Sequence, residues 1–165
     1  MGAPVAFDPI RYGHGMKRIL ITGMSGAGKS TVVRELISMG FHAVDSDYGY
    51  VRVDDEGYQM WDEAAVRRLL DDPVADALYF AGCEENMVDF LPDFDSIVLL
   101  TAPAEVLLER VKTRDNNPFG KLETDVDRIT FDIEHIEPRL KNIADVEIRT
   151  DEDLELVIAQ LLLLT

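Results

Sequence analysis

A nine-residue stretch near the start of the chain has the residue types and spacing of a phosphate-binding loop. It fits the pattern G-x-x-x-x-G-K-[ST] at every fixed position and reads Gly23-Met24-Ser25-Gly26-Ala27-Gly28-Lys29-Ser30-Thr31. Glycine permits positive φ angles and brings N–H groups close around an anion, where a Cβ would obstruct it. Lys29 is placed to reach the β- and γ-phosphates, and the Ser30 hydroxyl to bind Mg²⁺. We therefore assign nucleotide binding to Gly23, Ser25, Gly26, Ala27, Gly28, Lys29, Ser30 and Thr31.

The residues on either side supply the context that such a loop needs. Residues 18–22 have the composition of a short buried strand, and apolar residues then recur at helical spacing from Val32 to Ile37. A helix that begins directly after the loop points its unpaired N–H groups and its positive dipole end at the phosphates. The alternative is an ordinary glycine-rich turn, which would not require the Lys-Ser-Thr sequence.

Two carboxylates follow the second predicted strand, residues 41–44. In an open parallel sheet, ligands bind outside the carboxyl ends of the strands, so Asp45 and Asp47 are expected beside the phosphate loop. Both point the same way if the strand pleat continues through them. One carboxylate can then hold Mg²⁺ while the other accepts the proton of an acceptor hydroxyl. The alternative is a polar turn that caps the next element.

The segment from 48 to 76 is expected to bind the acceptor. It contains Tyr48, Tyr50, Tyr58 and Trp61, together with Arg52, before a short helix that starts at about Asp62. The aromatic rings either stack on the acceptor or form a small local core, and the sequence leaves both interpretations open. Asp54-x-x-Gly57 is similar to a GTPase switch motif, but no Asn-Lys-x-Asp follows it.

Three more strands are predicted at 78–82, 97–101 and 146–150, and a closing helix follows that is capped by Thr150 or Asp151. Gly82 ends the first of these strands, and the residues after it are expected to line the acceptor site. No Asp-Glu pair follows residue 101. That absence argues against motor, transporter and AAA-type ATPases, which usually carry a second acidic motif there.

A lid is predicted at about 114–122. Arg110 and Arg114 stand four residues apart at the end of a helix, and Asp115 to Lys121 then interrupt it. Such a segment can bring cationic donors over the transferring phosphoryl group. The alternative is that both arginines pair with nearby glutamates on a solvated helix face. Pro138 should kink or end the helix after the lid.

Composition narrows the class of protein. The formal net charge is −16 and lysine plus arginine number 16 against 32 acids, so neither nucleic acid nor an anionic membrane is an expected partner. A single cysteine, Cys83, excludes a disulfide framework. The length of 165 residues fits one domain over 16–165, with 1–15 as a flexible extension that lacks a targeting pattern. We expect a cytoplasmic monomer or homodimer.

These motifs together resemble the shikimate kinase-like and nucleoside-monophosphate kinase-like group of P-loop kinases. The resemblance runs from about Met16 to the C-terminus and includes GMSGAGKST, the Asp-x-Asp, LERVKTR at 108–114 and ADVEIRT at 144–150. It implies an α/β, three-layer P-loop NTPase fold with a five-stranded parallel sheet of order 2-3-1-4-5 and a short lid. It also implies ATP and Mg²⁺ as cofactors.

The resemblance assigns roles to individual residues. Asp45 corresponds to the magnesium-associated acid and Asp47 to the contact of the acceptor hydroxyl, while Arg110 corresponds to the residue that stacks on adenine and Arg114 to the lid arginine at the phosphates. Two positions depart from shikimate kinases: Gly82-Cys83-Glu84 stands where they carry three glycines, and Ile136 stands where they carry an arginine. These departures predict an acceptor other than shikimate.

The leading hypothesis is therefore an ATP-dependent transfer of the γ-phosphoryl group to a hydroxyl of a small metabolite. Lys29, Asp47 and Arg114 are the expected catalytic residues, Asp47, Arg52 and Gly82 contact the acceptor, and Ser30 and Asp45 hold the metal. Residues 45–95 hold 15 acids but only 3 bases, Arg52, Arg67 and Arg68, which predicts a neutral or cationic acceptor. The alternatives are a nucleotide or dephospho-CoA-type kinase and an ATP-binding regulatory module without an acceptor.

Overall fold

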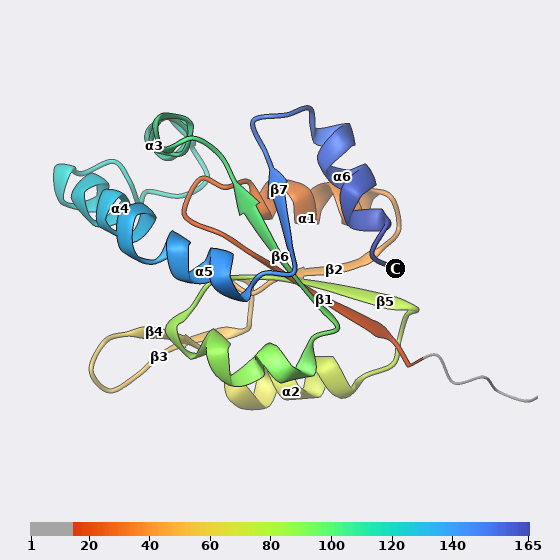
Figure 1. The fold of residues 1–165 in the computed structure, drawn as a ribbon. Helices are drawn as coiled ribbons and strands as arrows, with labels where there is room; N and C mark the ends of the chain where they lie inside the picture. Colours follow the sequence, from red (N-terminus) through yellow and green to blue (C-terminus); the bar gives the residue numbers. More distant parts are fainter. Residues whose placement is uncertain (1–14) are drawn as a thin grey trace, which may run out of the picture.

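A parallel sheet forms the centre of the chain in the computed structural model, which describes residues 15–165 (Figure 1). Its five strands are β1 (Lys17–Thr22), β2 (His42–Asp45), β5 (Ala77–Ala81), β6 (Ser96–Thr101) and β7 (Val146–Arg149). They lie in the order β2-β5-β1-β6-β7, so the predicted order 2-3-1-4-5 is confirmed. The extension expected at 1–15 lies almost wholly outside the described residues.

Helices cover both faces of this sheet, as the apolar strands require. Apolar side chains of β1, β5 and β6 are almost completely buried, because a parallel sheet between two helical layers has no solvated face. On one side lie α1 (Lys29–Ser38) and α6 (Leu154–Leu162); on the other lie α2 (Glu63–Asp71) and the 3₁₀ helix η1 (Glu85–Asp93) (Figure 1). The three-layer α/β architecture is therefore confirmed.

The predicted lid connects two helices beside the sheet. It joins α3 (Ala104–Thr113) to α4 (Glu123–His135), and residues 114–122 contain no helix or strand. A further helix, α5 (Glu137–Ile143), follows α4 after a break at Ile136. Pro138 stands in the first turn of α5, where its missing N–H removes no hydrogen bond. The expectation that Pro138 ends the longer helix is therefore confirmed.

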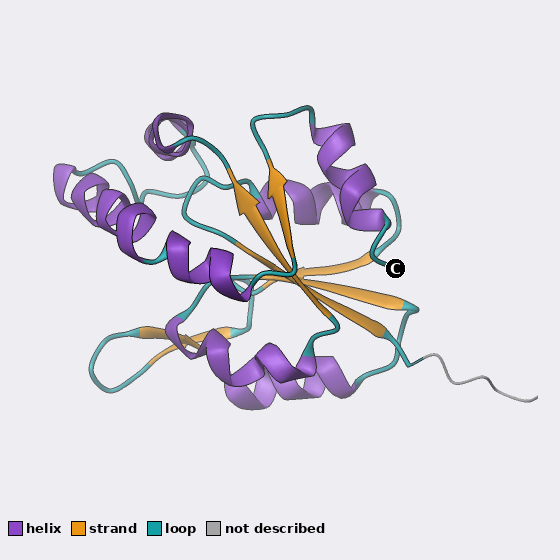
Figure 2. Ribbon diagram, viewed as in Figure 1, coloured by secondary structure: helices purple, strands orange, loops and turns teal. Residues whose placement is uncertain are grey.

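A small hairpin inside the segment 48–76 is absent from the sequence-based prediction. Strands β3 (Val51–Val53) and β4 (Gln59–Trp61) pair antiparallel apart from the main sheet (Figure 2). Their turn depends on Asp54, whose carboxylate accepts hydrogen bonds from the N–H groups of Glu56 and Tyr58 at 2.9 and 2.8 Å. Gly57 supplies a φ of 88° in the same turn. The Asp-x-x-Gly sequence is thus a turn signal.

The aromatic residues of this segment divide between core and surface. Trp61 is fully buried, with its ring centroid 5.0 Å from that of Phe80 and 5.5 Å from that of Phe90. Tyr48 is instead 73% exposed. The local-core interpretation therefore holds for Trp61, while Tyr48 stays available for a ligand.

The end of the last strand also differs from the prediction. Strand β7 ends at Arg149 and α6 begins after Asp153, so neither Thr150 nor Asp151 caps that helix. The Thr150 hydroxyl bonds to the phosphate loop instead, and the residue before the first turn of α6 is Asp153, two or three residues later than expected. Within 15–165, no helix has the length and apolar character needed to cross a membrane.

Candidate active site

The phosphate loop joins β1 to α1 in a conformation that depends on its glycines. Gly26 has a φ of 84°, and a Cβ built on it would lie 2.6 Å from the carbonyl oxygen of Leu107 in α3. Gly28 has a φ of 99° and forms the N-terminal boundary of α1, with no side chain capping that helix. The first N–H groups of α1 are therefore free of side-chain acceptors and face the loop, as anion binding requires.

Lys29 folds over the loop that precedes it. Its Nζ donates hydrogen bonds to the carbonyl oxygens of Gly23, at 2.6 Å, and Met24, at 3.1 Å. Burial lowers the pKa of Lys29, while the nearby Cys83, Asp47 and Asp45 act in the opposite direction. The ammonium group thus lies among acids in the position from which it can meet a phosphate.

Ser30 and Asp45 come together from different elements. The Ser30 hydroxyl, in the first turn of α1, donates a hydrogen bond of 2.6 Å to the Asp45 carboxylate at the end of β2. Hydroxyl and carboxylate oxygens suit Mg²⁺, which usually binds one or two protein carboxylates and completes its shell with phosphates and water. Residues 15–165 hold no group of three or more His, Cys, Asp or Glu side chains that could form an all-protein metal cage. The pair fits a metal carried in with the nucleotide.

Asp47 reaches the site through a turn. The expectation that the β2 pleat continues through it is wrong: β2 ends at Asp45, whose carboxylate accepts a hydrogen bond from the Asp47 N–H at 3.1 Å. Partial burial and then the adjacent Asp45 raise the pKa of Asp47, whereas Lys29 and Arg114 lower it. Asp47 thus lies within the field of both predicted catalytic cations.

Arg114 extends from the end of α3 toward the same place. Its guanidinium donates a hydrogen bond to the carbonyl oxygen of Phe119, 2.8 Å away, inside the predicted lid. Burial lowers the pKa of Arg114, and Asp47 opposes that shift. Neither Arg114 nor Arg110 forms an ion pair with a carboxylate in the described part of the chain, which argues against the surface-pairing alternative.

Arg110 lies one helical turn earlier and contacts the phosphate loop. Its Nη1 donates to the carbonyl oxygen of Gly26 at 3.2 Å and to the hydroxyl of Thr150 at 2.9 Å. Its Nη2 donates to the carbonyl oxygen of Thr150. Arg110, the predicted adenine-stacking residue, is therefore held through the edge of its guanidinium group.

A cavity of about 770 Å³ brings most of the predicted site residues together. Those that line it are Ser25, Gly26, Gly28, Lys29, Ser30, Thr31, Asp47, Arg110 and Arg114. The predicted lid contributes Asp115, Asn116 and Asn117 to the lining, whereas sequence reasoning missed Arg34, Thr113, Thr150, Glu152, Leu154 and Val157. The position of residues 150–154 after the last parallel strand is the signal that could have found that group, because ligands gather at the carboxyl ends of such strands.

Two predicted acceptor residues lie elsewhere. Arg52 is exposed on the outer hairpin and does not line the cavity, so a substrate contact for it stays an unsupported prediction. Gly82 is buried, and a Cβ on it would collide with the side chain of Ser46 and lie 2.9 Å from Nε1 of Trp61. The close packing around Gly82 therefore requires glycine at this position, and no contact with a ligand is needed to explain it.

Glu84 is one of the residues after Gly82 that were expected to line the acceptor site, and it is not among the residues that line the cavity. It follows β5, the strand that pairs with β2, and it is only half-exposed. Burial, followed by the charge of Asp47, raises the pKa of Glu84 to about 7. A carboxyl group near the site therefore changes charge close to neutral pH.

Comparison with known proteins identifies a family and relatives that this chain resembles. The model of the AAA domain family matches residues 19–130. A nucleotide-binding protein of Dinoroseobacter shibae is 30% identical over 152 residues, which cover 82% of this chain and 46% of that protein. A nucleotide-binding protein of Thermosipho melanesiensis is 27% identical over 135 residues, 80% of this chain and 47% of that protein. The chain thus spans about half the length of these curated relatives.

Solved structures share the fold over nearly the whole chain. Shikimate kinase from Acinetobacter baumannii in complex with shikimate has a TM-score of 0.64 and 24% identity, covering 90% of this chain and 93% of its own. A gluconokinase from Sinorhizobium meliloti has a TM-score of 0.57 and 16% identity, covering 91% of both chains. The resemblance to P-loop kinases is therefore confirmed at the level of the fold.

The family assignment also corrects one inference. The lack of an acidic pair after residue 101 argued against AAA-type proteins, and β6 indeed ends at Thr101 with Ala102 and Pro103 following. The absence of this acidic pair separates the chain from ATPases that need a second acidic motif. It did not justify excluding the AAA domain family. The chain belongs to the AAA domain family and has the P-loop kinase fold of shikimate kinase.

Proposed function

We propose that the protein is an ATP-dependent phosphotransferase that moves the γ-phosphoryl group to a hydroxyl of a small neutral or cationic metabolite. The observation that carries this proposal is that one cavity is lined by Lys29, Ser30, Asp47 and Arg114, with Asp45 bonded to Ser30. These are the positive, metal-binding and basic groups that phosphoryl transfer uses. A nucleotide sensor would need the first two but no acceptor base.

Each group has a task in the proposed reaction. Lys29 and the loop N–H groups hold the β- and γ-phosphates, and Ser30 with Asp45 holds Mg²⁺, which neutralises phosphate charge when bound. Asp47 positions the acceptor hydroxyl and takes its proton as the oxygen bonds to the γ-phosphorus. The bond from that phosphorus to the β-phosphate bridging oxygen breaks and ADP leaves. Arg114 stabilises the charge that develops on the transferring group.

The charges near Asp47 support a neutral or cationic acceptor. Of the 15 acids between residues 45 and 95, several have structural partners: Asp54 and Asp62 cap a turn and a helix, and Glu63 and Asp93 bind Arg67. Asp47 and Glu84 remain beside Lys29. Arg67 is one of only 3 bases in this range and is occupied by those ion pairs. A phosphorylated acceptor would therefore find few cationic partners.

The fold and family support the coarser part of the proposal. Shikimate kinase and gluconokinase, which share the fold, are kinases. A second candidate is an ATP-binding regulatory module, because the curated relatives are named only nucleotide-binding proteins and the chain spans about half of each. The two candidates differ in whether an acceptor accelerates ADP release.

The test supplies purified protein with ATP, Mg²⁺ and matched acceptors that are neutral, amine-bearing or phosphorylated. We expect slow ADP release alone and fast release with a neutral or amine-bearing acceptor. Lys29→Ala should lower the accelerated rate by about 10² to 10³, while Lys17→Ala, an exposed lysine on β1, should not change it. A preference for phosphorylated acceptors would overturn the substrate class, and equal activity of Lys29→Ala would overturn the assignment of the loop.

A further inference from the structure

The outward carbonyl groups of the phosphate loop need partners of their own. A loop that turns its N–H groups toward an anion turns several C=O groups away from it, and buried C=O groups are nearly always hydrogen-bonded. In the first part of the loop, Lys29 donates hydrogen bonds to the carbonyls of Gly23 and Met24. The carbonyls of Gly26 and Ala27 take their hydrogen bonds from elsewhere in the chain.

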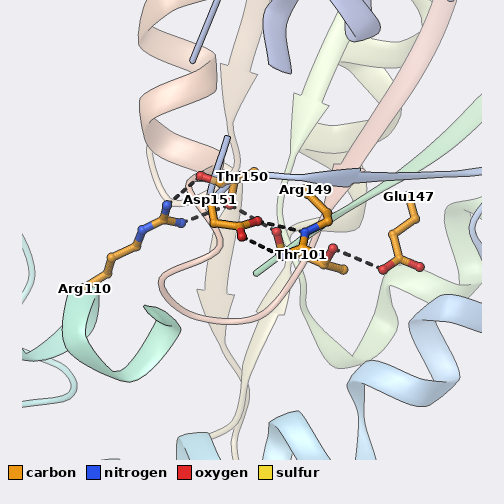
Figure 3. Close-up of polar contacts among 6 residues, drawn as sticks. All are labelled: Thr101, Arg110, Glu147, Arg149, Thr150 and Asp151. Carbon is orange, nitrogen blue, oxygen red and sulfur yellow. Dashed lines mark hydrogen bonds and ion pairs between the residues drawn. The ribbon is translucent and has the colours of Figure 1, made fainter. Parts of the chain in front are cut away.

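Those two carbonyls are held by Arg110 and Thr150. Arg110 donates to Gly26 at 3.2 Å, and the Thr150 hydroxyl donates to Ala27 at 2.7 Å. Arg110 also donates to the Thr150 hydroxyl at 2.9 Å (Figure 3). A hydroxyl carries one proton and can accept two further bonds, so a single Thr150 oxygen satisfies Ala27 and orients Arg110 together.

Thr150 is itself fixed from a third direction. Its N–H donates to the carbonyl oxygen of Thr101 at 2.8 Å, which ties the end of β7 to the end of β6. The methyl and hydroxyl of Thr150 also lie close to Gly28, where an added Cβ would be 3.8 Å from the Thr150 Cβ. The backbone that carries the hydroxyl is thus tied to the end of the sheet.

We propose that Thr150 is a positioning residue that keeps the phosphate loop in its anion-binding shape, through the carbonyl of Ala27 and through Arg110. Because the Thr150 hydroxyl bonds to the phosphate loop, we expect Thr150 to change the affinity for the phosphate chain, whichever base that chain carries. Arg110 also lines the cavity, where it can meet a base while its edge holds Gly26. This inference rests on the nucleotide binding in the proposed function.

The substitution series separates the hydroxyl from the rest of the side chain. Thr150→Val keeps the shape and removes the hydrogen bonds, and Thr150→Ser keeps the hydroxyl. Asp151→Asn is the matched control, since Asp151 is the next residue and pairs with Arg149 but not with the loop (Figure 3). Circular dichroism and thermal unfolding establish that each variant is folded at the temperature of the binding assay.

Calorimetry with Mg²⁺ then measures the affinity for ATP and for tripolyphosphate, a probe without a base. We expect Thr150→Val to weaken both by about tenfold, because the Ala27 carbonyl loses its donor, while Thr150→Ser and Asp151→Asn stay within about twofold of the parent. A folded Thr150→Val with unchanged tripolyphosphate affinity overturns the proposal. Loss of ATP affinity alone also overturns it, since that pattern would place Thr150 at the base.

Hydrogen exchange of the loop amides gives a readout that does not depend on ligand binding. We expect faster exchange at Ala27 and Gly28 in Thr150→Val than in the parent, and unchanged rates there contradict the proposal even if the variant is unstable. Parent protein that binds neither probe overturns both this inference and the proposed function. Binding without any acceptor-dependent transfer overturns the kinase assignment alone.

Discussion

The two sides of the cavity are held together in different ways. On the nucleotide side, side chains from distant elements bond to the loop backbone, as Arg110 does at Gly26 and Thr150 at Ala27. On the acceptor side the turns are ordered locally, since Asp54 and Asp62 accept hydrogen bonds from N–H groups two to four residues away. The polar contacts of this side to η1 run through Asn86 and Asp93 and leave the phosphate loop untouched. The phosphate chain is the same for every acceptor, so one side needs a fixed geometry. The other side can change piece by piece to fit a different acceptor.

Removal of the largest aromatic side chain tests whether the sides are separable. Trp61 is fully buried against Phe80 and Phe90, so Trp61→Ala should lower the free energy of unfolding by about 3 to 5 kcal/mol in urea titrations. Tyr58→Ala, at a residue that is 51% exposed, should change it by less than about 0.5 kcal/mol. At a temperature where the variant is folded, its ATP affinity should stay within about twofold of the parent. A large loss of affinity there would show that the sides are coupled.

Substitution of a glycine in the phosphate loop tests the nucleotide side in the same way. Gly26→Ala introduces a Cβ that would lie 2.6 Å from the Leu107 carbonyl oxygen at a φ of 84°. We expect it to lower the free energy of unfolding by about 2 kcal/mol or more and to abolish measurable tripolyphosphate binding. Gly40→Ala has a similar φ of 88° but open space around it, so it isolates the backbone cost of about 1 to 2 kcal/mol. Equal effects of the two substitutions would contradict the close approach of α3 to the loop.

Glu84 should make the acceptor side sensitive to pH. Because its folded pKa is about 7, above the ordinary value of 4.5, the unfolded chain releases this proton first and stability falls as pH rises from about 4.5 to 7. Glu84→Gln mimics the protonated form, so it should match the parent at pH 4 and be more stable by about 1 kcal/mol at pH 8, a value reduced for partial exposure. Glu85→Gln, at the exposed neighbour, is the control. A stabilisation equal at both pH values would contradict the assignment.

The sheet and the phosphate loop were predictable because their signals are local and strong. The central strands β1, β5 and β6 contain apolar runs, and the Lys-Ser-Thr sequence sits between β1 and a helical pattern. The hairpin was missed because its strands, at 51–53 and 59–61, are too short to show alternation. The turn chemistry of Asp54 and Gly57 was the usable signal.

Residues of the candidate site were predictable only where a local sequence motif determines their place in the fold. Lys29, Ser30 and Asp45 fall into place because the loop and the end of β2 bring them there. The roles of Thr150 and Glu84 could not be identified in the same way, since the partners of Thr150 are 49 and 123 residues away and the raised pKa of Glu84 depends first on burial and then on Asp47. Arg52 was chosen only because it is a lone arginine in the predicted acceptor segment, and it lies outside the cavity, so its contact with an acceptor stays a prediction.

The central claim is that Asp47 joins the two sides of the cavity into one reaction. The most direct measurement compares acceptor-dependent ADP release and Mg²⁺–ATP affinity in the parent, in Asp47→Asn, and in Asp55→Asn, an exposed carboxylate of the hairpin turn. We expect Asp47→Asn to lower the acceptor-dependent rate by about 10² or more while ATP affinity changes by less than about threefold, and Asp55→Asn to match the parent. An Asp47→Asn variant that transfers as fast as the parent would contradict the account.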